Sequence, residues 1–199
     1  MEPQFEIRAL HTETTVTVYQ AYPPEIGLPT ARDGRFPALW RRGRMTWIKP
    51  SFLWMMYRCG WGTKEGQQTV LAVEISREGF EWALARACLS HYAAGVHADH
   101  DDWKRQLHRA PTRVQWDPER DPLLRPLPYR SLQLGLAGEA AHRYADEWIV
   151  SVAEVTPLAR EVHAAVRDGD LDAARRLLPV ERPYPVPEGL LDRLRPSGG

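Results

Sequence analysis

Residues 44–58 carry the side chains best suited to binding a ligand. The indoles of Trp47 and Trp54 alternate there with the cationic groups of Arg44 and Lys49. Guanidinium and ammonium groups form charge-assisted hydrogen bonds to phosphate, and indole faces stack on flat rings and cations. This mixture predicts a pocket for a flat, anionic ligand. The competing interpretation places the aromatic rings in the core, with the cationic groups only reaching past them to solvent.

The elements around this segment can be predicted from local patterns. Residues 45–49 are expected to form a strand, and Ser51 is expected to cap a helix that starts directly after it. The free backbone N–H groups of that first turn would add an anion site. Residues 14–22 alternate β-branched and aromatic side chains, which predicts an earlier strand that ends at two prolines. Residues 69–75 are almost continuously apolar, which is typical of a central strand.

Further candidates lie in the second half of the chain. Residues 117–128 contain four prolines and are expected to form a loop of about a dozen residues, and loops of that length are often functional. Arg120 in this loop is a candidate phosphate ligand. Asp117 precedes a proline, which favours a structural role in a turn, while a role as acid or base stays open for Asp117 or Glu119.

A strand is expected at residues 129–136. Gln133 on this strand would suit ribose hydroxyls if it faces a cleft, or would be an ordinary solvated side chain if it does not. Arg130 lies on the opposite face of the strand from Gln133 and is counted among the cofactor-binding candidates.

Two other groups of residues give weaker predictions. His91 and residues 97–102 gather histidines and aspartates, but no cysteine pair or HExxH motif accompanies them. A solvated loop is therefore favoured over a metal site, and no metal is expected. Cys59 and Cys88 are too few for a disulfide framework and favour buried thiols over a nucleophile.

Composition limits the classes of function. The chain has 199 residues, with 26 basic and 26 acidic side chains and a formal net charge of zero. This balance argues against a general nucleic-acid or membrane-surface binder, although a local basic groove remains compatible with it. Neither a signal peptide nor a membrane span is expected. The two cysteines fit a reducing, cytoplasmic compartment.

The order of expected elements favours an α+β fold. Residues 1–156 are expected to form a single domain, with strands dominating its second half. Residues 157–182 are expected to form an appended helical pair, and residues 183–199 a loosely ordered tail.

Four stretches together resemble a bacterial and fungal family catalogued as domain of unknown function 4291. The resemblance covers about residues 5–157, and it is specific because four long stretches occur in the same order. The family carries no established activity. The stretches are residues 17–22, 44–58, 114–120 and 130–136.

A strand that contains Tyr19-Gln20 is followed by a short helix, by Gly34-Arg35-Phe36 and by a second strand with Thr46. This order faintly resembles the opening of ADP-ribosyltransferase-like folds. It implies a mixed, mostly antiparallel split sheet around a cleft that binds NAD. Those folds place His or Arg on the first strand, Ser, Thr or Tyr on the second, and Glu or Gln on a late strand. Gln20 or Tyr19 would fill the first place, Thr46 or Ser51 the second, and Gln133 the third. Gln20 departs from His or Arg, and Gln133 departs from the usual Glu, which implies an unusual acceptor or a cleft without chemistry.

Three hypotheses follow. In the first, the protein transfers ADP-ribose from NAD to a nucleic-acid or protein acceptor. Trp47 would stack on the nicotinamide, Lys49 and Arg44 would bind the diphosphate, and Gln133 would hold ribose hydroxyls. In the second, the same groups bind a nucleotide or RNA without turnover. In the third, the tryptophans are core residues of a structural or partner-binding protein.

Overall fold

A computed structural model describes residues 4–196 of the chain, and it has the predicted α+β architecture. The strands are β1 (Arg8–Ala9), β2 (Thr15–Tyr22), β3 (Thr46–Ile48), β4 (Thr69–Ser76), β5 (Ala87–Leu89), β6 (Thr112–Arg120), β7 (Pro126–Leu136), β8 (Ile149–Glu154) and β9 (Arg182–Pro183). The helices are α1 (Pro24–Asp33), α2 (Phe52–Cys59), α3 (Arg77–Ala85), α4 (His100–Arg109), α5 (Glu139–Arg143), a π-helical turn (Tyr144–Trp148), α6 (Thr156–Arg167) and α7 (Leu171–Leu177).

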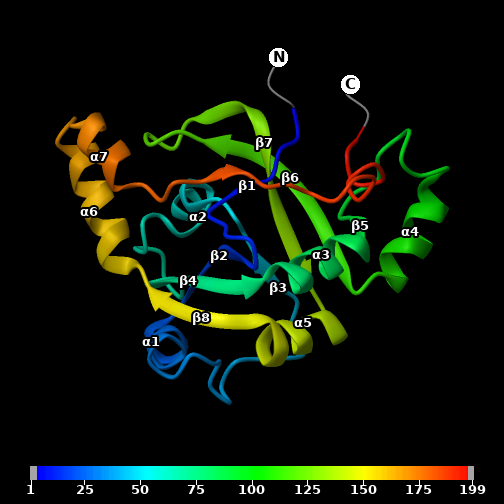
Figure 1. The fold of residues 1–199 in the computed structure, drawn as a ribbon, viewed down its shortest axis with the longest axis horizontal. Helices are drawn as coiled ribbons and strands as arrows, with labels where there is room; N and C mark the ends of the chain where they lie inside the picture. The colour runs from blue at the N-terminus through cyan, green and yellow to red at the C-terminus, as the bar shows by residue number, and fades with distance from the viewer. Residues whose placement is uncertain (1–3, 197–199) are drawn as a thin grey trace.

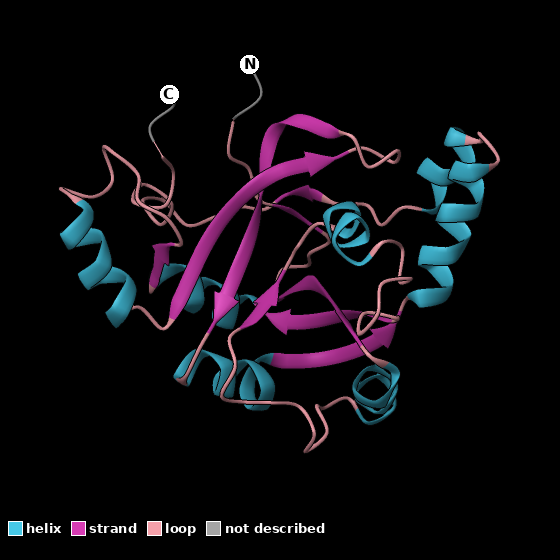
Figure 2. Ribbon diagram, turned by 180° about the vertical axis from the view of Figure 1, so that it is seen from behind, coloured by secondary structure: helices cyan, strands magenta, loops and turns pink. Residues whose placement is uncertain are grey.

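Two open sheets form the centre of the molecule (Figures 1 and 2). One is antiparallel, in the order β2-β4-β8. The other has the order β3-β7-β6-β5, with β5 and β6 parallel and the remaining pairs antiparallel. A single bridge joins β2 to the end of β3, where the Tyr19 N–H donates to the Lys49 carbonyl at 2.7 Å. Mixed, mostly antiparallel sheets were predicted, and the structure confirms them.

Local sequence explains the elements next to this junction. The Ser51 hydroxyl accepts a hydrogen bond from the Trp54 N–H at 3.1 Å and so caps α2, as predicted. The helix ends at Gly60, whose φ of 59° is the left-handed conformation that glycine adopts without strain. Gly27 lets α1 lie directly on β4, because a Cβ atom there would be 2.5 Å from the Thr69 side chain.

The predicted helical pair is present as α6 and α7, at one end of the molecule in Figure 1. Ala159, Val162 and Ala174 on these helices are fully buried. They belong to a hydrophobic cluster that also contains Phe52 and Met56 of α2. The pair therefore shares a core with the helix that follows β3.

The expected long loop at residues 117–128 is instead the distal part of a hairpin. β6 and β7 pair almost to their tips, and the turn between them is closed by hydrogen bonds from the Asp121 N–H to the Arg125 carbonyl and from the Leu124 N–H to the Asp121 carbonyl. Pro118 is accommodated because the register shifts between Pro118 and Arg120, which is a place where a sheet tolerates a residue without an N–H.

Two other boundaries differ from the prediction. The sequence pattern alone predicts a helix from Phe80 to about Tyr92, but α3 ends at Ala85 and β5 follows it, because a short apolar run cannot be assigned to helix or strand by periodicity alone. The polar stretch before residue 103 already contains the start of α4, where the Asp99 carboxylate accepts from the Asp102 N–H at 2.7 Å.

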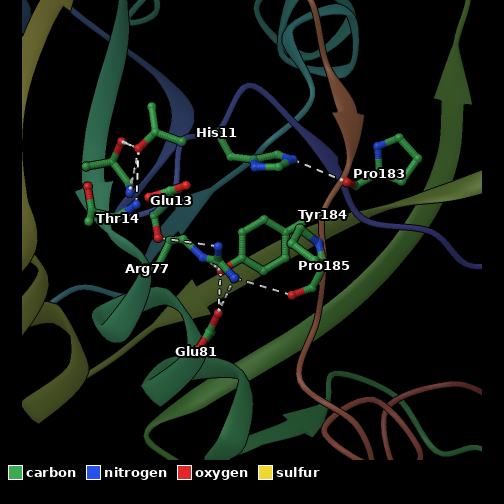
Figure 3. A network of polar contacts seen from close by, with 10 residues as sticks. His11, Glu13, Thr14, Arg77, Glu81, Pro183, Tyr184 and Pro185 are labelled. Carbon is green, nitrogen blue, oxygen red and sulfur yellow. Dashed lines mark hydrogen bonds and ion pairs between the residues drawn. The ribbon is translucent and has the colours of Figure 1, made fainter.

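The segment after β9 packs against the domain, where the sequence predicted a loosely ordered tail. The Tyr184 hydroxyl donates to Glu81 at 2.7 Å, and Arg77 donates to that hydroxyl at 3.0 Å. Figure 3 shows these three side chains together. Further along, Leu194 is fully buried and its carbonyl accepts from the Trp116 indole N–H at 2.6 Å. Buried apolar side chains hold this segment as far as Leu194. The last three residues of the predicted tail lie outside the described range.

None of the helices within residues 4–196 has the length and apolar character needed to cross a bilayer.

Candidate functional site

A cavity of about 690 Å³ lies where β2, β3 and the β6–β7 hairpin come together. α1, α2, the loop before β3 and the loop before β4 complete its walls. It is therefore assembled from segments that are more than a hundred residues apart in the sequence. Its lining residues are Gln20, Ala21, Tyr22, Pro23, Glu25, Ile26, Leu39, Trp40, Arg41, Arg44, Met45, Thr46, Trp47, Lys49, Met55, Arg58, Gly66, Gln67, Gln115 and Gln133.

The structure brings six of the predicted site residues to this one cavity. They include Gln133, which the sequence proposed as the distant partner of the segment around β3. The six residues are Gln20, Arg44, Thr46, Trp47, Lys49 and Gln133.

Four predicted residues lie outside the lining. The Tyr19 ring is buried against Phe52 at a centroid distance of 5.4 Å. The Ser51 hydroxyl donates to the Glu119 carboxylate at 2.9 Å in addition to capping α2. The guanidinium of Arg120 lies 3.6 Å from the Tyr57 ring centroid, and that of Arg130 donates to the Trp116 carbonyl at 3.1 Å.

The cavity is strongly cationic. Arg41, Arg44, Arg58 and Lys49 line it, whereas Glu25 is its one lining carboxylate among the described residues. Within residues 4–196, none of these four cationic groups forms an ion pair, and their side-chain nitrogens donate no hydrogen bond. Arginines on a protein surface commonly pair with a neighbouring carboxylate, as Arg42 does with Asp146. The free cations around the cavity are therefore available to an anion.

Lys49 is the most unusual of these groups. Its side chain is 5 % exposed, and Nζ lies 5.0 Å from the centroid of the Trp54 ring. Burial, assisted by the charge of Arg58, lowers the pKa of Lys49 to about 7, while Asp117 and Cys59 act in the opposite direction. The amine therefore changes charge near neutral pH, and an entering anion would favour its protonated form.

The Trp47 ring lies against Gly135 of the neighbouring strand β7. Trp47 pairs with Gly135 in the sheet, and a Cβ atom on that glycine would lie 2.9 Å from the far edge of the indole and 2.9 Å from the Met45 sulfur. The absence of a side chain at Gly135 therefore lets the ring lie close to the strand. Trp47 is partly exposed to the cavity, so its ring can serve as a stacking surface.

Gln20 and Thr46 belong to a buried polar network on one wall. The Gln20 amide donates to the Thr46 hydroxyl at 2.7 Å and to the Trp47 carbonyl at 3.1 Å, and its oxygen accepts from the Tyr144 hydroxyl at 2.6 Å. The Tyr22 hydroxyl lies 3.2 Å from the Thr46 oxygen. Gln20 thus uses both its donors and its acceptor to join β2, β3 and the π-helical turn.

Gln133 belongs to a second network, on the β6–β7 wall. Its amide nitrogen and that of Gln115 each donate to a different oxygen of the Asp117 carboxylate, both at 2.9 Å. Gln115 is a cavity residue that the sequence pattern does not reveal, because the prolines near its partner Asp117 predict a loop there. A strand through residue 117 would have placed Gln115 and Asp117 on one face, two residues apart.

Arg41 and Arg58 were also missed as cavity residues. Arg58 closes the segment 44–58 that the sequence singled out, and Arg41 lies in a cluster of arginines before it. The histidines at residues 91–102 are not among the residues that line this cavity. Within the described part of the chain, no group of three or more His, Cys, Asp or Glu side chains is arranged to hold a metal.

Comparison with models of protein families identifies the family of this chain. The model of a domain of unknown function, DUF4291, matches residues 6–184. The chain belongs to this family. The DUF4291 match includes both sheets, the cavity, and the pair α6–α7, so it extends beyond the region where the resemblance was expected. Comparison with curated proteins finds no match to the chain.

Proposed function

We propose that the cavity binds NAD and that the protein transfers ADP-ribose from it to a nucleic-acid or protein acceptor. One observation carries the binding part of this proposal: cationic groups that have no ion pair within residues 4–196, an indole and a glutamine pair line one cavity. Each group matches a part of a dinucleotide, namely its phosphates, its flat rings and its sugars.

In this proposal, Arg44, Arg58 and Lys49 bind the diphosphate. Trp47 stacks on a ring of the ligand, which gains energy without selecting a particular base. Gln133 contacts ribose hydroxyls. The volume of the cavity is within the range of small-molecule sites, about 300–1,000 Å³.

The transfer step is proposed from the likeness of the order of elements to ADP-ribosyltransferase-like folds, and is therefore an analogy of fold. The bond between nicotinamide and ribose C1 would break, with its electron pair leaving on nicotinamide. The acceptor would form a new bond to C1 and lose a proton. The cationic groups would hold the diphosphate in place during this exchange.

Calorimetric titration with NAD tests the binding. We expect the Arg44→Gln variant to bind at least tenfold more weakly than the parent protein, because a hydrogen bond to a charged group contributes about 1.5–3 kcal/mol. Arg42→Gln is the matched control, since Arg42 lies outside the lining and pairs with Asp146. Equal losses in both variants, or an absence of NAD binding at millimolar concentration, would overturn the proposal.

Release of nicotinamide and a mass increase on RNA, DNA or protein acceptors test the transfer.

A specific observation also favours a second candidate function, a nucleotide- or RNA-binding module without turnover. Gln20 uses both amide hydrogens and Gln133 uses one in intramolecular bonds, and Glu25 is the one carboxylate among the described lining residues. Salt-sensitive nucleotide binding without nicotinamide release would select this second function.

The Gly135→Ala variant tests the role of Trp47. The added methyl group would displace the indole from β7, since it would stand 2.9 Å from the ring. We expect about a tenfold loss of NAD affinity, because stacking of a base on an aromatic side chain is worth about 1–3 kcal/mol. Gly43→Ala is the control, because a Cβ atom there meets no atom within 4 Å. An unchanged affinity in Gly135→Ala would contradict stacking on Trp47.

A further inference from the structure

Gln115, Gln133 and Asp117 form a small arrangement on the cavity-facing side of the β6–β7 hairpin. Gln115 and Gln133 are direct partners across the two strands, and Asp117 follows Gln115 by two residues. Residues opposite one another on an antiparallel pair have Cβ atoms about 4.5–5.5 Å apart. The two amide groups therefore reach the cavity side by side.

The carboxylate determines how both amides are turned. Carboxylate oxygens accept hydrogen bonds, so each glutamine must present its NH₂ group to Asp117. The two N–O distances of 2.9 Å fit such bonds. Each side-chain carbonyl oxygen must then be directed away from Asp117. Within residues 4–196, neither carbonyl oxygen accepts a hydrogen bond.

We propose that the carbonyl oxygens of Gln115 and Gln133 form an acceptor pair that holds the vicinal hydroxyls of a ribose, and that Asp117 is the positioning residue that sets this pair. The inference rests on the proposed nucleotide-binding function and deepens it. Two adjacent neutral acceptors require two adjacent donors in the ligand. A sugar diol supplies them next to a phosphate, which the cations of the same cavity bind.

The acceptor pair predicts discrimination between ribose and deoxyribose. A buried site that is built to bind a hydroxyl rejects the analogue lacking it, because its polar group is then left without a partner. The neighbouring cations bind the phosphate of either sugar. The contribution of the sugar hydroxyls to affinity can therefore be measured separately from that of the phosphate with small probes.

The probes are methyl β-ribofuranoside 5-phosphate, its 2-deoxy analogue and inorganic phosphate, with affinities measured by calorimetry. The methyl group locks both sugars as rings. We expect the parent protein to bind the ribose probe about tenfold more tightly than the deoxy probe, which corresponds to one hydrogen bond. In Asp117→Asn we expect this ratio to fall to near one, because the new amide can donate to a glutamine carbonyl and turn it. Because Asp117 also acts on the pKa of Lys49, inorganic phosphate reports any change at the anion site, and the ratio between the two sugars carries the test.

Asp121→Asn is the matched control. Asp121 lies in the turn of the same hairpin, pairs with Arg125 and does not line the cavity, so this variant should keep the full ratio. Equal binding of both sugars by the parent protein would overturn the acceptor pair while leaving the anion site standing. A ratio that persists in Asp117→Asn would overturn the positioning role. If neither sugar phosphate nor phosphate binds, the proposed function itself fails.

Discussion

The Lys49→Met variant should unfold at a higher temperature than the parent protein and should lose the NAD affinity that is proposed for the cavity. The amine of Lys49 is buried without an ion pair among the described residues, and its charge is costly there. Methionine fills a similar length with an apolar chain. A residue that lowers stability in an otherwise well-packed wall is typical of a functional site.

The pH dependence of this effect has a definite sign. In the unfolded chain the amine binds a proton below its ordinary pKa of 10.5, whereas in the folded protein it does so only below about 7. The penalty on folding is therefore complete below about pH 7 and disappears as the pH rises toward 10.5. The stability gained in Lys49→Met should be a few kcal/mol at pH 6.5, since one pKa unit corresponds to about 1.4 kcal/mol, and should be much smaller at pH 10.

Denaturant unfolding at these two pH values measures the gain, and calorimetry at pH 6.5 measures the lost affinity. Lys104→Met is the control, because Lys104 lies on the exposed α4 and forms only a surface ion pair with Asp101, so its stability should change little. A Lys49→Met variant that is less stable than the parent at pH 6.5 would show that the ammonium group is stabilised in the fold. If the variant binds NAD as tightly as the parent does, Lys49 does not contribute to ligand binding.

Local patterns were sufficient for the elements that hold the site. The alternation of β2 and the Ser51 cap of α2 are properties of consecutive residues, and both are present in the structure. The same patterns brought Arg44, Trp47 and Lys49 to one wall, since they belong to one short strand and its flanks. Local patterns cannot predict that Gln133 lies near β3, because about ninety residues separate the two. That prediction depends on the resemblance to ADP-ribosyltransferase-like folds.

The remainder of the site depends on pairing that a single sequence does not encode locally. Prolines at 118 and 126 predicted a loop, yet the register shift in β6 allows the hairpin to continue. Without that hairpin, Gln115 could not be placed opposite Gln133, and Asp117 could not be recognised as the partner of both. Likewise, the pKa of Lys49 depends on burial beneath Trp54 and on Arg58, which requires the α2 helix to be in position.

Replacing Gln20 with Met should destabilise the protein by about 3–5 kcal/mol. Gln20 is 4 % exposed, and its amide joins Thr46, the Trp47 carbonyl and the Tyr144 hydroxyl. Methionine has a similar length but makes none of these bonds. Thr46 keeps the Tyr22 hydroxyl beside it, whereas the Trp47 carbonyl and the Tyr144 hydroxyl each lose the bond to Gln20. A buried group left without a partner costs about 1–3 kcal/mol. Denaturant unfolding at neutral pH measures the loss.

The Tyr144→Phe variant makes this prediction specific. It removes one donor to Gln20 and should cost about 1–2 kcal/mol. The two substitutions share a bond, so the double variant should be destabilised by less than the sum of the two single changes. Strict additivity would contradict the bond between them. A catalytic role for Gln20 predicts something different, namely full stability with lost nicotinamide release. The unfolding measurements on Gln20→Met therefore decide whether the main role of this residue is structural. In that role it holds β2 against β3 and so stabilises the wall that carries Trp47 and Lys49.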